Sequence, residues 1–300
     1  METDLERIWQ HLEWIAAEPR AAETARLEEC RRYCEQQLTR GGWQVQRRPF
    51  TATSSEMQPL SGVNLIATHP LASDQQPTLI LGAHLDSREN TPGADDNASA
   101  VAVLLETARL AGTKFSAAGT NSLTVNLQLA VFDLEEHGML GGAFHAATCR
   151  AAGHPVAGMV SLEMLGYCSH RPGSQMFPPE LAEQYPDVGN FIGVVGNQIS
   201  GPLLQAFCRA FESVADLPCE ALQVSENGQH LPPTRLSDHS PFWDAGFAAL
   251  MVTDTSFMRN PHYHQPTDTP DTLDREFLHK VAEGVWRATS EITARGIEAG

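Results

Sequence analysis

The sequence predicts an α/β fold of the three-layer sandwich type, in which helices cover both faces of a central mixed, mostly parallel sheet. Short, nearly continuous apolar runs of the buried-strand type alternate with helical segments along the chain. The chain has 300 residues, 42% of them hydrophobic, which suffices for one large α/β domain. There is no convincing linker or internal repeat, so we expect residues 1–300 to form a single domain.

The expected elements rest on periodicity and on stop signals. Apolar residues at helical spacing open the chain, and the glycine pair Gly41-Gly42 ends the second helix. Helices are expected over residues 5–15, 22–39, 97–111, 141–150, 201–215 and 274–294. Strands are expected over residues 42–50, 63–68, 78–83, 123–132, 160–162, 191–195 and 248–253. The loop-like stretches 169–190 and 225–235 are expected to form rims around a cleft.

The charge balance excludes several classes of partner. Lys and Arg total 20 against 37 Asp and Glu, a formal net charge of −17. Phosphates would be repelled, so we expect binding neither to nucleic acid nor to an anionic membrane. No signal-peptide pattern and no membrane-spanning apolar run is visible, which predicts a cytoplasmic protein. The six cysteines are expected to be reduced, with Cys30 and Cys34 on one helix face rather than in a metal site.

Acids and histidines gather directly after the apolar strands. In open α/β sheets the carboxyl ends of the strands border the ligand crevice, so four strand ends are expected to deliver these side chains to one edge. The side chains concerned are His84, Asp86, Glu135, Glu136, Glu163, His262 and His264. Glu163 stands inside the apolar run MVSLEML, where a charge is costly unless it is paired or bound to a metal.

Imidazole and carboxylate ligands without thiolates suit zinc in a catalytic site. One carboxylate can bridge two metals, and the loop GADDN could place such a group near a helix N-terminus. Adjacent Glu135 and Glu136 point in different directions, so one could bind metal while the other acts as a general base. Asp86 could orient His84 from behind.

Five motifs in order resemble the co-catalytic zinc aminopeptidases, a family that also includes glutamate carboxypeptidase II and the glutaminyl cyclases. They are HLDS, GADDNAS, a Glu pair followed by glycine, a strand-borne acid, and YHQPTDTPD, and they span about Thr78 to Leu273. The resemblance implies two zinc ions, or another divalent metal. It implies that His84 and Glu163 bind the first ion. Glu136 and His264 would bind the second, and Asp96 would bridge both.

The resemblance also implies the chemistry. Glu135 would be the general base, Asp86 the partner of His84, and Tyr263 a donor to the developing oxyanion. The expected activity is that of a zinc exopeptidase, an aminopeptidase that hydrolyses the N-terminal peptide bond of a peptide or aminoacyl substrate with a metal-bridged water. Glu163 departs from the Asp of many aminopeptidases, which alters the site beside the first metal.

Three alternatives stay open. A single-zinc aminoacyltransferase of the glutaminyl cyclase type would hold one ion instead of two, and the segment SDHSPF resembles one in that branch. A carboxypeptidase or dipeptidase would carry an inserted domain, for which no clear segment is visible. An inactive binding module on the same scaffold would have lost ligands, whereas the ligand set here is complete.

Other polar residues near these motifs are expected to serve the local structure. Asp95 and Asn97 are interpreted as turn or helix-start residues, and Asp238 as an N-cap. Arg259 and Asn260 could grip a substrate carboxylate or anchor a loop. Turns explain Asp268 and Asp271, and His239 and His262 are expected to lie behind the site or on the surface.

Overall fold

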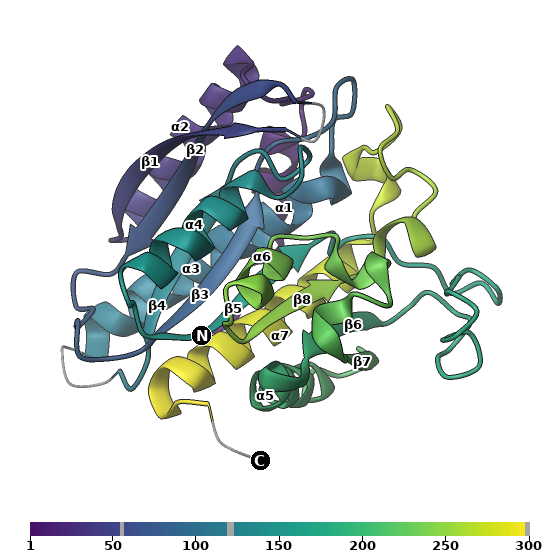
Figure 1. Cartoon of the computed structure of the whole chain (residues 1–300). Helices are drawn as coiled ribbons and strands as arrows, with labels where there is room; N and C mark the ends of the chain where they lie inside the picture. Colours follow the sequence, from purple (N-terminus) through teal and green to yellow (C-terminus); the bar gives the residue numbers. More distant parts are fainter. Residues whose placement is uncertain (55–56, 119–122, 298–300) are drawn as a thin grey trace.

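The computed structural model describes residues 1–54, 57–118 and 123–297. Its centre is a single 8-stranded mixed sheet in the order β1-β2-β4-β3-β5-β8-β6-β7 (Figure 1). The strands are β1 (Gln44–Thr53), β2 (Pro59–Thr68), β3 (Thr78–His84), β4 (Asn126–Phe132), β5 (Val156–Glu163), β6 (Ile192–Asn197), β7 (Cys219–Val224) and β8 (Ala249–Thr253). This arrangement confirms the predicted α/β class.

Four neighbouring strands, β4, β3, β5 and β8, run parallel to one another and form the middle of the sheet. Strand β6 runs antiparallel to β8, and β7 pairs in parallel with β6. On the other side, β2 is antiparallel to β4 and forms a hairpin with β1. Every residue of β3 and β4 is buried, as expected of strands covered by helices on both faces.

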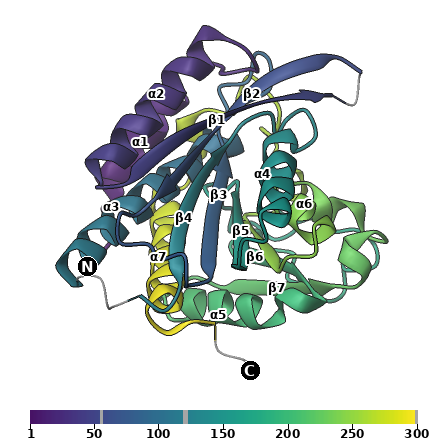
Figure 2. The same ribbon diagram turned by 60° about the vertical axis from the view of Figure 1, so that its left-hand side comes forward.

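Helices cover both faces of the sheet, which Figure 2 shows nearly edge-on. The helices are α1 (Leu5–Ile15), α2 (Ala25–Arg40), α3 (Ala100–Ala118), α4 (Leu140–Ala151), α5 (Gly201–Glu212), α6 (His239–Asp244) and α7 (Arg275–Arg295). Apolar side chains of α1, α2, α3, α5 and α7 form the larger core on one face. Those of α4 and α6 form a smaller core on the other face. None of the described helices is long and apolar enough to cross a membrane.

Side-chain caps explain where several helices begin. The carboxylate of Asp4 accepts from the Arg7 amide at the start of α1, and Asp274 caps α7 in the same way. The second helix ends at the glycine pair, where Gly42 adopts a φ of 87° that favours glycine. Its Cys30 and Cys34 lie buried in the core, and all six cysteines are free.

The bounds of several elements differ from the sequence prediction. Strand β7 was missed, because its exposed and half-buried residues do not form an apolar run. Strand β4 begins at Asn126 rather than at residue 123. The helix expected to start at Asn97 starts at Ala100, because the Asn97 side chain donates to the carbonyl of Leu162 and accepts from the amide of Met164. Asn97 therefore ties its loop to the end of β5.

Candidate metal centre

The four parallel strands bring the predicted polar residues to one edge, as the sequence predicts. His84 and Glu163 are the last residues of β3 and β5, while Glu135 and Glu136 follow β4. His264 lies in the long segment after β8. The register places these strand ends side by side, so residues far apart in the sequence meet here.

Two groups of side chains at this edge could each hold a metal ion. His84, Asp96 and Glu163, which we call the inner cluster, have ligand atoms within 4.8 Å of one another. The same holds for Asp96, Glu136 and His264, which we call the outer cluster. The structure thus brings together all five residues that the sequence predicts as metal ligands.

Asp96 belongs to both clusters and faces a histidine with each carboxylate oxygen. Its Oδ1 lies 3.2 Å from Nε2 of His84, and its Oδ2 lies 3.1 Å from Nε2 of His264. Glu163 completes the inner cluster with Oε1 at 3.5 Å from His84 Nε2. Glu136 completes the outer cluster with Oε2 at 3.2 Å from His264 Nε2. This arrangement suits a carboxylate that bridges two ions.

The loop that carries Asp96 is fixed by a residue from the far end of the chain. The buried carboxylate of Asp268 accepts from the backbone amides of Asp95 and Asp96, at 2.9 and 3.1 Å. Asp268 was expected to form a turn, and its structural role is larger. It locks the Asp96 loop to the segment that carries His264.

Asp86 fixes the position of the two adjacent glutamates. Its carboxylate oxygens accept from the amides of Glu135 and Glu136, at 3.1 and 3.2 Å. Toward His84 the shorter contact is made by the backbone: Nδ1 lies 3.1 Å from the Asp86 carbonyl and 3.6 Å from its carboxylate. The predicted contact between Asp86 and His84 therefore exists mainly through the main chain.

Glu135 lies beside the inner cluster and borders the pocket. Its Oε2 is 3.9 Å from Nε2 of His84, and its side chain is 14% exposed. Burial raises the pKa of Glu135 well above its usual value; the imidazole of His84 opposes this rise, and the carboxylate of Glu163 adds to it. A carboxylate in such surroundings holds a proton more tightly than one in water, as a proton acceptor in catalysis should.

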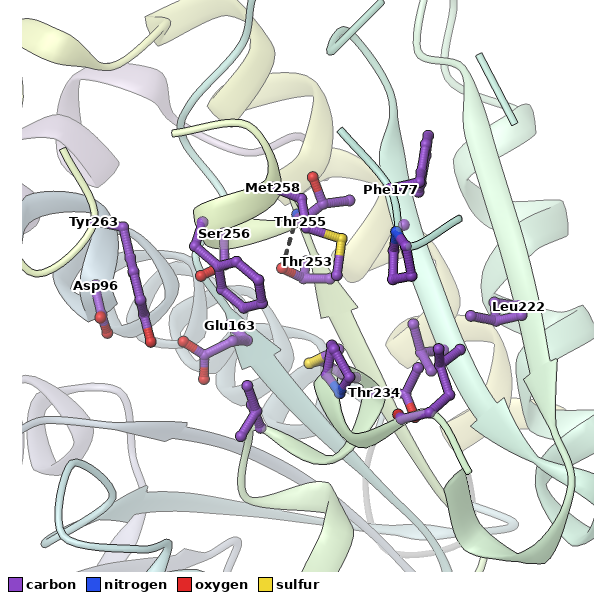
Figure 3. Close-up of a pocket in the computed structure, with 18 of the residues that line it drawn as sticks. Asp96, Glu163, Phe177, Leu222, Thr234, Thr253, Thr255, Ser256, Met258 and Tyr263 are labelled. Atoms are coloured by element: carbon purple, nitrogen blue, oxygen red, sulfur yellow. Dashed lines mark hydrogen bonds between the residues drawn. The ribbon is translucent and has the colours of Figure 1, made fainter. Parts of the chain in front are cut away.

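Tyr263 also reaches the pocket wall. Its ring stacks on His264 with centroids 3.7 Å apart. Burial raises its pKa, and the nearby carboxylates of Asp96 and Glu136 raise it further, so its hydroxyl stays protonated and can donate. Figure 3 shows this ring alongside Asp96 and Glu163.

The donor set fits zinc. The buried Nε2 of His84 and Oε1 of Glu136 have no hydrogen-bond partner within the described residues. Buried polar atoms are normally paired, so two orphaned ligand atoms in one place indicate a missing partner. Imidazole and carboxylate ligands without cysteine are typical of catalytic zinc.

A pocket opens from the metal clusters along the sheet and encloses about 210 Å³. Metal-cluster residues line one part, and mostly apolar residues such as Phe177 and Leu222 line the other (Figure 3). The predicted rims are confirmed, since Phe177 and Tyr185 of the first loop and Leu231 and Thr234 of the second line this pocket.

Two buried residues next to the site differ from their predicted roles. Asp238 was expected to be an N-cap, but its side chain makes no capping hydrogen bond to α6. It is fully buried, and burial raises its pKa to about 8. His239 is a core residue rather than a surface group: its Nε2 lies 2.8 Å from the Thr234 carbonyl, and burial lowers its pKa to about 3.

The remaining polar residues anchor loops. Asp95 is buried and accepts from the Gly166 amide and from Asn260, outside both clusters. Arg259 is buried and donates to Gln175 and to the carbonyl of Phe191, which ties down the segment that covers the pocket. The loop-anchoring alternative for Arg259 and Asn260 therefore matches the geometry.

Sequence reasoning missed three contributors. Ser237 donates to Oε2 of Glu163 at 2.7 Å, and Arg88 pairs with Oε2 of Glu136 at 2.8 Å. The third is Glu220 of β7, which lines the pocket. The SDHS segment is the one visible signal for Ser237, whereas an isolated Arg or Glu gives no signal in a single sequence.

Histidine and carboxylate ligands without cysteine, at the carboxyl edge of a mixed α/β sheet and beside a pocket, are typical of a metal-dependent hydrolase. Comparison with known proteins makes this specific. The model of Peptidase family M28 matches residues 64–289, and the chain belongs to this family.

Two relatives illustrate the range of similarity. The uncharacterized protein YfbL of Escherichia coli (strain K12) is 36% identical over 244 residues, which cover 77% of this chain and 72% of the relative. A probable leucine aminopeptidase of Trichophyton verrucosum (strain HKI 0517) is 31% identical over 225 residues, 72% of this chain and 53% of the relative. The chain thus spans about half the length of that aminopeptidase.

Solved structures share the fold. The glutaminyl cyclase of Porphyromonas gingivalis has a TM-score of 0.73 at 19% identity, covering 96% of this chain and 98% of the other. A Zn-dependent exopeptidase of Parabacteroides distasonis (ATCC 8503) has a TM-score of 0.72 at 18% identity, covering 98% and 99%. At these identities the likeness shows the architecture alone.

Proposed function

We propose that this protein is a two-zinc aminopeptidase that hydrolyses the N-terminal bond of a peptide or aminoacyl substrate. The observation that carries the proposal is the position of Asp96, whose two oxygens face His84 and His264 at 3.2 and 3.1 Å. One carboxylate shared by two candidate ligand sets supports a site for two metal ions.

Zinc would supply a Lewis acid and a water of lowered pKa. Glu135 would take the proton from the attacking water and return it to the leaving amine. The hydroxyl of Tyr263 would donate to the carbonyl oxygen as negative charge develops there. Asp86 holds the Glu135 amide and so keeps the base in position. Membership of Peptidase family M28 and the similarity to probable leucine aminopeptidases support this assignment.

Metal analysis combined with substrate panels tests the proposal. Protein purified in zinc buffer should contain about two ions per chain and should release single residues from the N-terminus of unblocked peptides. Peptides acetylated at the N-terminus should be stable. Release from the C-terminus of blocked peptides would contradict the aminopeptidase assignment in favour of a carboxypeptidase.

A second candidate is a single-zinc glutaminyl cyclase. The buried acid Asp238 lies near Glu135 and belongs to the segment SDHSPF, which resembles one in the cyclase branch, and this supports the second candidate. Such an enzyme would hold one zinc ion and would release ammonia from peptides with N-terminal glutamine. Ammonia release with an intact peptide backbone would decide for the cyclase.

A further inference from the structure

The pocket floor is a row of four residues across the sheet. Glu163 of β5 pairs with Thr253 of β8, Thr253 pairs with Gly193 of β6, and Gly193 pairs with Glu220 of β7. Directly paired residues project to the same face of a sheet, and all four line the pocket. Three strand spacings separate the ends, about 14 Å between the Cα atoms of Glu163 and Glu220.

The same face of the sheet is apolar next to this row. The next row of pairs on the same face joins Met251, Val195 and Leu222, which all line the pocket. Between the two acids, the floor offers the small side chain of Thr253 and the bare backbone of Gly193. Small residues at these two positions favour a long, unbranched apolar stem over a branched one. Figure 3 shows Leu222 on the side of the pocket opposite Asp96 and Glu163.

Glu220 gives the far end of the pocket a negative charge. Within the described lining it is the one acid that lies outside the metal clusters and is not adjacent to them in sequence. It is half-buried, and the described part of the chain offers it no ion-pair partner within 4.0 Å. Burial raises its pKa, as expected of a carboxylate that lacks a cation.

Aromatic rings stand on the same side of the pocket. Phe177 and Tyr185 both line it, with ring centroids 5.4 Å apart. The hydroxyl of Tyr185 donates to the Ala221 carbonyl of β7 at 2.9 Å, which holds the ring next to the strand that bears Glu220. An aromatic pair beside a carboxylate is a favourable environment for a cation on a carbon stem.

We propose that the pocket selects substrates whose N-terminal residue is arginine or lysine. The aliphatic stem lies over Thr253 and Gly193 against Met251, and the cationic head pairs with Glu220. This inference rests on the proposed aminopeptidase function, since it places the residue before the scissile bond in the pocket. A leucine side chain would fill only the near part of the pocket and would leave Glu220 without a partner.

Kinetics with matched substrates test the role of Glu220. The aminoacyl 4-nitroanilides of arginine, citrulline, lysine, norleucine and leucine separate charge from length, because citrulline is a neutral analogue of arginine. The zinc-loaded wild type should show a kcat/KM for arginine at least tenfold above that for citrulline. Glu220→Gln should bring this ratio close to one, through a fall in kcat/KM for arginine that is at least tenfold larger than any change for norleucine.

Glu212→Gln is the matched control, because it removes an exposed acid close to β7 that does not line the pocket. It should keep the preference for arginine. A wild type that prefers leucine or norleucine, or a preference for arginine that Glu220→Gln leaves intact, would overturn the proposal. Equal hydrolysis of tripeptides whatever their first side chain would also overturn the proposal. Glu220 would then bind the N-terminal ammonium group and not a cationic side chain.

Binding separates the failure of this inference from failure of the proposed function. Calorimetry with argininamide and norleucinamide on zinc-loaded protein needs no turnover. If no substrate is hydrolysed but argininamide binds at least tenfold more tightly than norleucinamide, and only when Glu220 is present, the aminopeptidase proposal fails and the pocket assignment stands. Equal binding of the two amides would overturn the pocket assignment whether or not the protein hydrolyses peptides.

Discussion

The inner and outer clusters share Asp96 but differ in their distance from solvent. The inner histidine, His84, has a side chain that is 1% exposed, whereas that of the outer histidine, His264, is 26% exposed. The ring of His84 is also held from behind by the carbonyl of Asp86, and His264 Nδ1 has no such partner in the described part of the chain. The inner cluster is therefore the more enclosed of the two, and the outer one is more accessible to solvent.

The largest expected effect comes from the residue that both clusters share. Asp96→Asn should remove activity and lower the zinc affinity of both clusters. The loss should exceed the 10- to 100-fold that residues hydrogen-bonded to a metal ligand contribute. Asp95→Asn should retain zinc, because Asp95 lies outside both clusters and contacts Gly166 and Asn260 instead. Metal analysis after dialysis measures both. Equal zinc loss in the two variants would contradict the bridging role.

Glu135→Gln separates chemistry from metal binding. The rate should fall by about 10²- to 10⁴-fold, the usual contribution of a general base. Zinc content should stay at the wild-type level, because Glu135 is absent from both ligand groups. Stopped-flow or progress-curve assays with metal analysis on the same sample provide the measurement. A variant that keeps the full rate with zinc bound would exclude Glu135 as the base.

Chelation should distinguish the clusters themselves. The outer ion should leave at roughly tenfold lower chelator concentration than the inner one. His84 of the inner cluster has the Asp86 carbonyl behind its ring, and such a partner of a ligand histidine is worth about 10- to 100-fold in metal affinity. His264→Gln should contain one tightly held ion and lose the weak phase of a zinc titration. Release of both ions in one step from the wild type would show that the clusters are not independent.

The smallest effect concerns Arg88, which pairs with Glu136 in the outer cluster but is 47% exposed. Exposed ion pairs contribute at most about 1 kcal/mol, so Arg88→Met should tighten the outer ion by only about two- to fivefold. Zinc affinity should rise and not fall, because the substitution removes one positive charge beside the ion. Arg7→Met, an exposed arginine on α1, is the control. Weaker zinc binding in Arg88→Met would mean that Arg88 positions Glu136.

Much of this fold could be predicted from the sequence because its central strands are covered on both sides. Such strands are continuous apolar runs, and the fully buried β3 and β4 are examples. The edge strand β7 is half-exposed and gave no such signal. The candidate ligands could be located because each lies at the end of one of the buried strands or in the segment that follows it.

What supports those ligands could not be predicted. Asp268 looks like a turn residue in PTDTPD. Only the fold shows that its carboxylate accepts hydrogen bonds from the backbone amides of the Asp96 loop. Asp238 stands just before a short helix and so looked like a cap, yet its carboxylate is buried beneath the site. A buried acid at a loop and an exposed one look alike when tertiary contacts are unknown.

The contact between Asp268 and the amide of Asp96 joins residues 172 positions apart. Closing a loop of this length costs chain entropy before the contact can stabilise the fold. The loop that presents Asp96 is thus held in place only after the segment beyond β8 has docked. During refolding, zinc affinity should consequently rise only once this segment has docked. Zinc binding would then indicate that these contacts have formed, and it would not initiate folding.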